Sequence, residues 1–156
     1  MNSALPIFAL ITLAAFVQAG EEPAQPADAG SSKPRTLTIG PSSASLSLGR
    51  AKLFIGHLKL RAGACIGSYK LDVIPFTFKS ENGSISIAAS EAAFVKLARG
   101  VAVNFTGKAV TDGTGETRAV TAVATPTSKE AGNVTFSFQV DAGKLVFNAA
   151  YRIGEH

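Results

Sequence analysis

Four basic side chains within residues 50–61 could together hold an anionic group. The stretch reads RAKLFIGHLKLR, and its bases are Arg50, Lys52, Lys59 and Arg61. Arginine and lysine donate charge-assisted hydrogen bonds to phosphate and carboxylate oxygens, and Phe54 between them offers an apolar contact. The residue types therefore predict a binding site for an anionic amphiphile, made of Arg50, Lys52, Phe54, Lys59 and Arg61. A solvated basic face without a ligand is the alternative interpretation.

These bases can share one face only if the strand that carries them is irregular. Side chains alternate between the two faces of a strand, yet the charges occupy even positions before Gly56 and odd positions after it. Burial of an unpaired charge is very costly, so a regular strand is disfavoured. One extra residue near Gly56, a β-bulge, restores a common outer face. The inward positions would then be Ala51, Leu53, Ile55, Leu58 and Leu60.

No combination of residues in the chain predicts catalysis or metal binding. Nucleophilic catalysis needs a base beside the nucleophile, and the chain has only Cys65, His57 and the terminal His156 for such a pair. A metal site needs several converging ligands. Five carboxylates are expected in or beside turns, where they cap and solvate the chain: Glu81, Asp112, Glu116, Glu130 and Asp141. We therefore expect no enzyme activity, no catalytic residue, no metal ligand and no cofactor.

Cys65 is the single cysteine of the chain, so no internal disulfide can form. Its neighbours in the stretch GACIG are small or apolar. We interpret the thiol as a small hydrophobic group in the core. A disulfide between two chains is the alternative.

Alternation of apolar and polar residues predicts antiparallel strands over most of residues 36–153. Turn signals recur about every 8–12 residues, which is typical of an all-β sandwich or barrel. Glu81-Asn82-Gly83 and the DGTG stretch at 112–115 predict hairpin turns. Pro75, inside an apolar run, predicts an edge strand or a bulge.

One segment departs from this alternation and predicts a helix at about 91–99. Ser90 suits the N-cap, Glu91 the first turn, and Gly100 the C-terminal stop. The sequence therefore predicts an all-β fold, mainly an antiparallel sandwich or barrel, with one short α-helix. One domain over residues 36–153 is long enough to bury a core without disulfides.

The N-terminal residues predict export. Residues 1–19 resemble a signal peptide, with an apolar run from Leu5 to Val17 and small side chains before a cut after Ala19. A membrane anchor is the alternative. A spanning helix needs about 20 apolar residues, and the run from Leu5 to Val17 is shorter. Residues 20–35 are rich in Pro, Ala, Gly and acid and predict a flexible tail. We expect a periplasmic or secreted protein with no transmembrane span in the mature chain.

The charge of the chain narrows the choice of partner. The formal net charge is +4, and residues 33–156 carry 15 bases against 8 acids, or +7. A basic domain favours acidic partners, here an anionic lipid or an acidic glycan. Without tryptophan and with two tyrosines, an aromatic platform for nucleic acid is not expected. We therefore expect a non-enzymatic binding domain for an anionic amphiphile or envelope lipid. The alternative is a structural accessory of the envelope that binds a protein partner through an edge strand.

Overall fold

A computed structural model of the chain describes residues 34–141 and 143–155. The predicted signal peptide at residues 1–19 lies outside the described residues. The predicted tail at 20–35 also lies outside them, except for Pro34 and Arg35.

The described chain forms ten strand segments, one α-helix and one short 3-10 helix. The strands are β1 (Arg35–Ile39), β2 (Ser42–Leu46), β3 (Gly49–Ile55), β4 (Leu58–Arg61), β5 (Ala64–Ile74), β6 (Glu81–Ala88), β7 (Val103–Thr111), β8 (Thr117–Pro126), β9 (Ala131–Val140) and β10 (Gly143–Glu155). The helices are η1 (Thr77–Lys79) and α1 (Glu91–Ala98).

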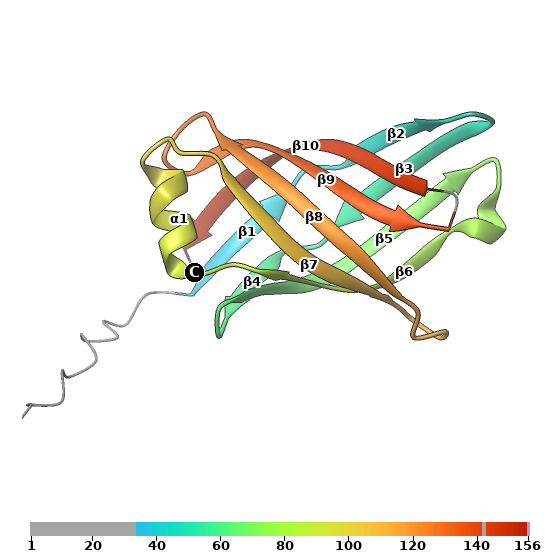
Figure 1. The fold of residues 1–156 in the computed structure, drawn as a ribbon, viewed down its shortest axis with the longest axis horizontal. Helices are drawn as coiled ribbons and strands as arrows, with labels where there is room; N and C mark the ends of the chain where they lie inside the picture. Colours follow the sequence, from blue (N-terminus) through green and yellow to red (C-terminus); the bar gives the residue numbers. More distant parts are fainter. Residues whose placement is uncertain (1–33, 142, 156) are drawn as a thin grey trace, which may run out of the picture. The chain divides into compact units, whose positions relative to one another are not determined.

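The strands close into an eight-stranded antiparallel barrel (Figure 1). The ten segments give eight barrel strands because β1 and β2 follow one another around a break at Gly40-Pro41, and β3 and β4 do so at Gly56-His57. The ring closes where β1 pairs with β10 and where β5 pairs with β6. Closure leaves few free edges, which removes the commonest route to aggregation of β-proteins. The all-β prediction is confirmed, and the architecture is the barrel.

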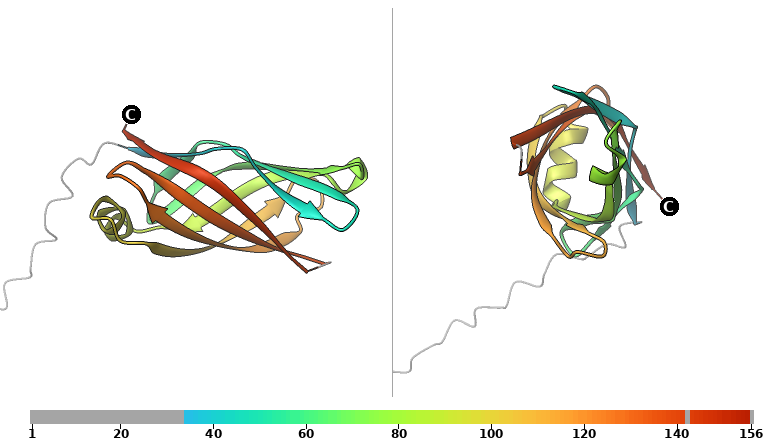
Figure 2. Two further views of the ribbon diagram at one scale, coloured as in Figure 1. Left: turned by 90° about the horizontal axis from the view of Figure 1, so that it is seen from above. Right: turned by 90° about the vertical axis from the view of Figure 1, so that its right-hand side faces the viewer.

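Helix α1 lies across one end of the barrel (Figure 2). The Ser90 side chain accepts a hydrogen bond from the backbone N–H of Ala93 at 3.3 Å, as expected of an N-cap. Phe94 and Leu97, three residues apart on one helix face, are buried in the barrel core. The predicted helix is therefore confirmed, and its apolar face closes this end of the barrel.

The predicted bulge at Gly56 is present. Ile55 pairs with Tyr69 and Lys59 pairs with Ile66, so three residues of the β3–β4 strand lie opposite two residues of β5. The backbone N–H of Gly56 still donates to Ser68 O at 2.9 Å. The extra residue places Ala51, Leu53, Ile55 and Leu58 in the core and leaves Leu60 partly buried against it.

Two predicted features of the β5–β6 connection are wrong. Residues 81–83 do not form a hairpin turn, because β6 begins at Glu81. The chain turns earlier, through η1, and Pro75 follows the last residue of β5 instead of lying in an edge strand. Pro75 lacks the N–H that would continue the β5 ladder, so the strand ends before it. By contrast, the DGTG stretch links β7 to β8 as the predicted hairpin turn.

Candidate functional site

The five residues predicted to bind a ligand all point outward, but they do not form one cluster. Phe54 is 41% exposed, and the bases at positions 50, 59 and 61 are exposed, while Lys52 is half-buried. Arg50 and Arg61 are eleven positions apart, about 36 Å along a strand at roughly 3.3 Å per residue. A single head group could therefore contact one pair of bases, Arg50 and Lys52 or Lys59 and Arg61, and never all four.

The pair in β3 has further neighbours. Lys52 lies opposite Asp72 of β5, whose carboxylate already binds Lys70 at 3.0 Å. Lys52 and Phe54 also line a shallow depression on the outer wall, beside Ser43 and Asn148. Arg50 lies opposite Ile74, the last residue of β5. Of the predicted residues, Arg50 is thus the one placed at the end of the barrel opposite α1, which we call the mouth.

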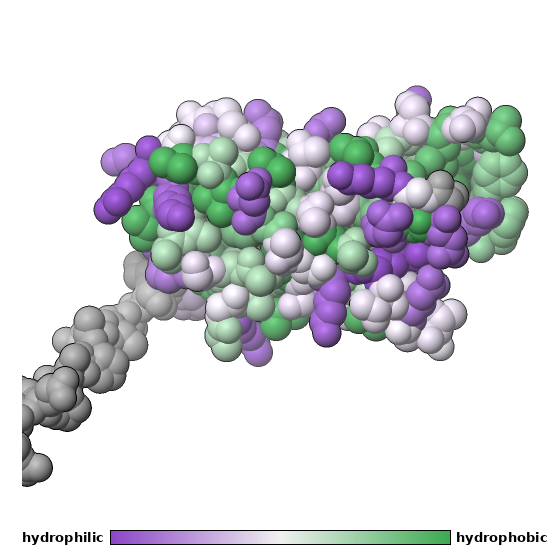
Figure 3. All heavy atoms as spheres, in the orientation of Figure 1, coloured by the Kyte–Doolittle hydropathy of each residue, from purple (hydrophilic) through white to green (hydrophobic). Residues whose placement is uncertain are grey.

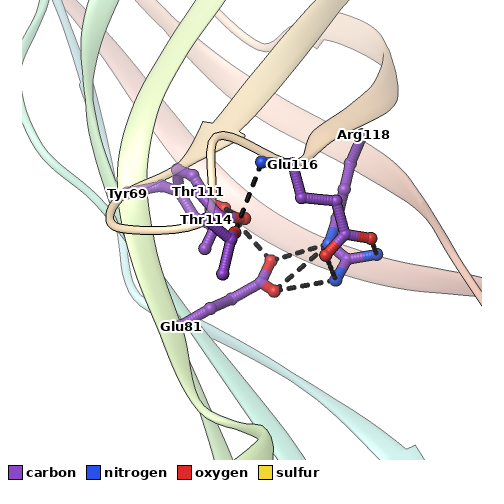
Figure 4. A network of polar contacts seen from close by, with 6 residues as sticks. All are labelled: Tyr69, Glu81, Thr111, Thr114, Glu116 and Arg118. Atoms are coloured by element: carbon purple, nitrogen blue, oxygen red, sulfur yellow. Dashed lines mark hydrogen bonds and ion pairs between the residues drawn. The ribbon is translucent and has the colours of Figure 1, made fainter.

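A charged network that the sequence did not predict lies inside the barrel near the mouth (Figure 4). The guanidinium of Arg118 donates from Nε to Glu81 Oε1 and from Nη2 to Glu81 Oε2, both at 2.9 Å. Both side chains are only 11% exposed. This bidentate geometry is the strongest form of an arginine–carboxylate pair. The hydrogen bonds to Glu81 are the main reason that the pKa of Arg118 is raised.

Hydroxyl groups complete the network. The Tyr69 hydroxyl donates to Glu81 Oε1 at 3.0 Å and lies 3.1 Å from Thr111 Oγ1. Burial is the main cause of the raised pKa of Tyr69. Glu116, in the β7–β8 connection, contacts the Arg118 guanidinium at 3.3 Å. Each polar group thus has partners, which is the condition for charges to persist inside a fold.

Strand parity explains both the network and why it was missed. Glu81 shares its face with Ile85 and Ile87, and Arg118 shares its face with Val120 and Ala122, all of them core residues. Because Glu81-Asn82-Gly83 was predicted to be a turn, the predicted strand began only at Ile85 and left Glu81 out. Extension of the Ile85–Ile87 alternation back by two more pairs would have placed Glu81 inward.

Above the network the mouth opens into a cavity of about 410 Å³. Its apolar walls are formed by Leu46, Leu71, Val73, Phe78, Val140 and Leu145, and its floor includes Glu81 and Arg118. The volume lies within the range of small-molecule sites, about 300–1,000 Å³. We call this the mouth cavity.

The charges around the mouth cavity constrain its ligand. Two bases, Lys79 and Arg118, and three acids, Glu81, Glu116 and Asp141, line it, a formal balance of 2 − 3 = −1. Arg118 is already engaged by two carboxylates. The floor therefore offers no free cation for an anion, and an anionic group would find its bases at the rim.

The barrel interior below the floor is packed. Phe138 lies within the core, with its ring centroid 5.9 Å from Tyr69 and 6.0 Å from Phe147. Phe138 and Phe147 are fully buried. The spacing is that of favourable aromatic pairs. The mouth cavity is consequently a cup that ends at this layer.

At the other end, a hollow of about 340 Å³ lies beside α1, between Arg35, Phe94 and Lys129. Beneath α1 lies a much smaller cavity of about 20 Å³ among apolar side chains. That volume admits about one water molecule. Cys65 lines it, and burial raises the pKa of its thiol to about 11. The Tyr151 hydroxyl is buried there without a hydrogen-bond partner among the described residues. The buried position of Cys65 agrees with a small hydrophobic core residue.

The structure does not bring the possible Cys–His pair of Cys65 and His57 together. His57 is exposed and bonds Thr38 Oγ1 at 3.0 Å, whereas Cys65 faces the interior. Within residues 34–141 and 143–155, no three His, Cys, Asp or Glu side chains are placed to share a metal ion. No helix in the same residues has the length and apolar character needed to cross a bilayer.

Comparisons of the chain with known protein families, with curated proteins and with solved structures found no match. The features of the chain that bear on its function are the barrel, its mouth cavity and the Glu81–Arg118 pair.

Proposed function

We propose that this protein is an exported, non-enzymatic binding domain that holds the apolar part of an amphiphile in the mouth cavity. The observation that carries the proposal is an open cavity of about 410 Å³ with six apolar wall residues above a fully paired polar floor. Such a cavity can bury a ligand's apolar surface, and burial contributes about 25 cal/mol per Å². Export rests on the signal-peptide pattern of residues 1–19.

The ligand's head group would lie at the opening of the mouth cavity, on the side that carries the bases. Arg50 and Lys79 lie at the β2–β3 and β5–β6 side of the mouth. The acids Glu116 and Asp141 lie at the β7–β8 and β9–β10 side. An anionic head group is favoured beside the bases and disfavoured beside the acids. The six apolar wall residues favour an anionic lipid over an acidic glycan, because they can bury an acyl chain and a glycan has none.

The alternative function, a protein that adds strands to a partner, has less support. Its predicted edge at Pro75 lies in a turn, and β5 is paired on both sides. Among the described strands, β2 pairs with β3 alone, but it is only five residues long. A short edge of this kind is a weak template for strand addition.

The test is the lipid content of the protein purified from its host. We expect mass spectrometry of an organic extract to find an anionic amphiphile in stoichiometric amount with the wild-type chain. Leu145→Trp, which fills the mouth cavity, should abolish its retention. Val123→Trp, on the exposed outer wall of β8, is the matched control and should retain it. Lipid that is absent from the wild type, or equally retained by both variants, would refute the proposal.

A further inference from the structure

Two neighbouring turns at the mouth expose large apolar side chains to solvent. Leu48, in the β2–β3 turn, is 76% exposed, and Phe78, in η1, is 79% exposed. These are the two most exposed large apolar side chains of the described residues, and Ile74 between them is 44% exposed. Figure 3 shows hydrophobic surface at this end of the molecule, over the tips of these turns. We call Leu48, Ile74 and Phe78 the apolar rim, of which Phe78 also lines the mouth cavity.

The two turns are held together by their backbones. Arg50 pairs with Ile74, and Gly49 lies so close to the Ile74 carbonyl and to Pro75 that it has no room for a side chain. The β2–β3 turn is therefore packed directly against the end of β5. The apolar rim is therefore carried by two turns whose backbones lie against each other.

The β5–β6 turn is also supported internally. The Phe78 ring packs edge-on against Phe76, with centroids 6.0 Å apart, and Phe76 in turn packs against the core. The backbone N–H of Val73 donates to Ser80 Oγ at 2.9 Å across the turn. Phe78 is thus presented to solvent by an ordered turn. Exposed apolar patches on ordered structure are typical of interaction sites.

The charges next to the apolar rim are basic, whereas the acids Glu116 and Asp141 lie at the β7–β8 and β9–β10 side of the mouth. Arg50 is the cross-strand neighbour of Ile74, and Lys79 follows Phe78 in the chain. Neither base forms an ion pair within the part of the chain that the structure describes. The closest acid on these strands, Asp72, is bound to Lys70, and Glu81 is bound to Arg118 inside the barrel. The rim thus combines apolar tips with two bases that no acid of the described residues pairs with.

We propose that the apolar rim docks the mouth of the barrel onto a lipid bilayer with anionic head groups. Binding at such an interface grows with the apolar area inserted and with attraction between basic residues and anionic lipids. The rim supplies both. A stable protein interface usually buries at least about 1,000 Å² of complementary surface, which two protruding tips do not offer. This inference goes beyond the proposed function, because docking does not require the mouth cavity to hold a ligand.

A tryptophan reporter gives the direct test, since the chain contains no tryptophan. Phe78→Trp places one at the rim, and Val101→Trp places one on an exposed position beside α1, at the other end. With vesicles of phosphatidylcholine and phosphatidylglycerol, we expect the emission at position 78 to shift to the blue and to be quenched by brominated acyl chains. The emission at position 101 should change in neither respect.

Vesicle flotation of substituted chains separates the two contributions. Leu48→Ser/Phe78→Ser should weaken binding by roughly tenfold or more, from the apolar surface lost. Arg50→Gln/Lys79→Gln should weaken it by about fivefold or more per base on anionic vesicles, an effect that salt should mimic. Ile66→Ser, which removes an exposed apolar side chain from the outer wall of β5, is the matched control and should bind like wild type.

Three results would overturn docking: no binding to anionic vesicles, equal quenching at positions 78 and 101, or wild-type binding by Leu48→Ser/Phe78→Ser. A blue shift at position 78 that arises without vesicles, together with a dimer by light scattering, would assign the rim to self-association instead. The Leu145→Trp variant distinguishes ligand binding in the mouth cavity from membrane docking. It should lose the retained lipid and still float with vesicles.

Discussion

Glu81 and Arg118 are charged residues whose side chains point into a barrel. Each alone would lose most of its hydration there, and the mutual pairing offsets that loss. Their position is set by strand parity, which directs them to the same side as the core residues of β6 and β8. The pair forms the polar floor that separates the mouth cavity from the aromatic layer at Phe138.

Removal of one partner should therefore be worse than removal of both. We expect Glu81→Ala to lower the free energy of unfolding by about 2–3 kcal/mol, because Arg118 would remain largely buried without its main partner. The double variant Glu81→Met/Arg118→Met should stay within about 1 kcal/mol of wild type. Urea denaturation followed by circular dichroism measures both. An equal loss of unfolding free energy in the single and the double variant would contradict a buried ion pair.

The sequence predicted individual outward residues better than inward charged ones. The positions of Arg50, Lys59 and Arg61 followed from the high cost of burying an unpaired base. Glu81 and Arg118 violate that expectation because each finds a partner 37 positions away in the chain. Such a partner becomes visible only when the register of β6, β7 and β8 is known.

At the scale of the element, the bulge in the β3–β4 strand explains a glycine on the opposite strand. A Cβ built at Gly67 would lie 2.7 Å from Leu58 Cδ2 and 3.0 Å from the His57 carbonyl oxygen, both within or beside the bulge. A Cβ at Gly56 itself would meet only the Ser68 hydroxyl at 2.8 Å, and a hydroxyl can rotate away. The tighter constraint is thus at Gly67 and not at the bulge residue.

Valine substitutions should rank accordingly. We expect Gly67→Val to lower the free energy of unfolding by about 2–3 kcal/mol, because it overpacks a core contact with Leu58. Gly56→Val should cost about 1 kcal/mol, from the bulge backbone and the Ser68 contact. The shift of the urea midpoint for each variant gives the comparison. A larger effect at Gly56 would place the strain in the bulge residue itself.

Short sequence motifs predicted secondary structure correctly where that structure depends only on neighbouring residues. The cap and the dipole charges of α1 involve residues within one helix, and the helix is where they predict it. The Asn82-Gly83 pair carries an equally local turn signal, yet it lies within β6. Pairing with β5 on one side and β7 on the other outweighs the turn preference. Tertiary pairing of this kind is not visible in a short window of sequence.

At the scale of the whole barrel, the two ends differ in physical character. One end is covered by α1, with a cavity of about 20 Å³ beneath the helix and a hollow of about 340 Å³ beside it, between Phe94, Ala98 and Lys129. The other opens into the mouth cavity and carries the apolar rim. The alternation of residues predicted a closed or packed β-structure, but it carries no information about which end stays open. That asymmetry comes from the placement of α1 after β6 and of η1 before it.

The central claim is that the mouth cavity binds the apolar part of an anionic amphiphile. The most direct measurement is a methyl NMR titration of the protein with lysophosphatidylglycerol below its micelle concentration. We predict saturable shifts of the methyl groups of Leu71, Val73 and Leu145, which line the mouth cavity, with none at Val134 beneath α1. Shifts confined to outer-wall residues such as Val123 and Val146, or the absence of any saturable shift, would contradict the claim.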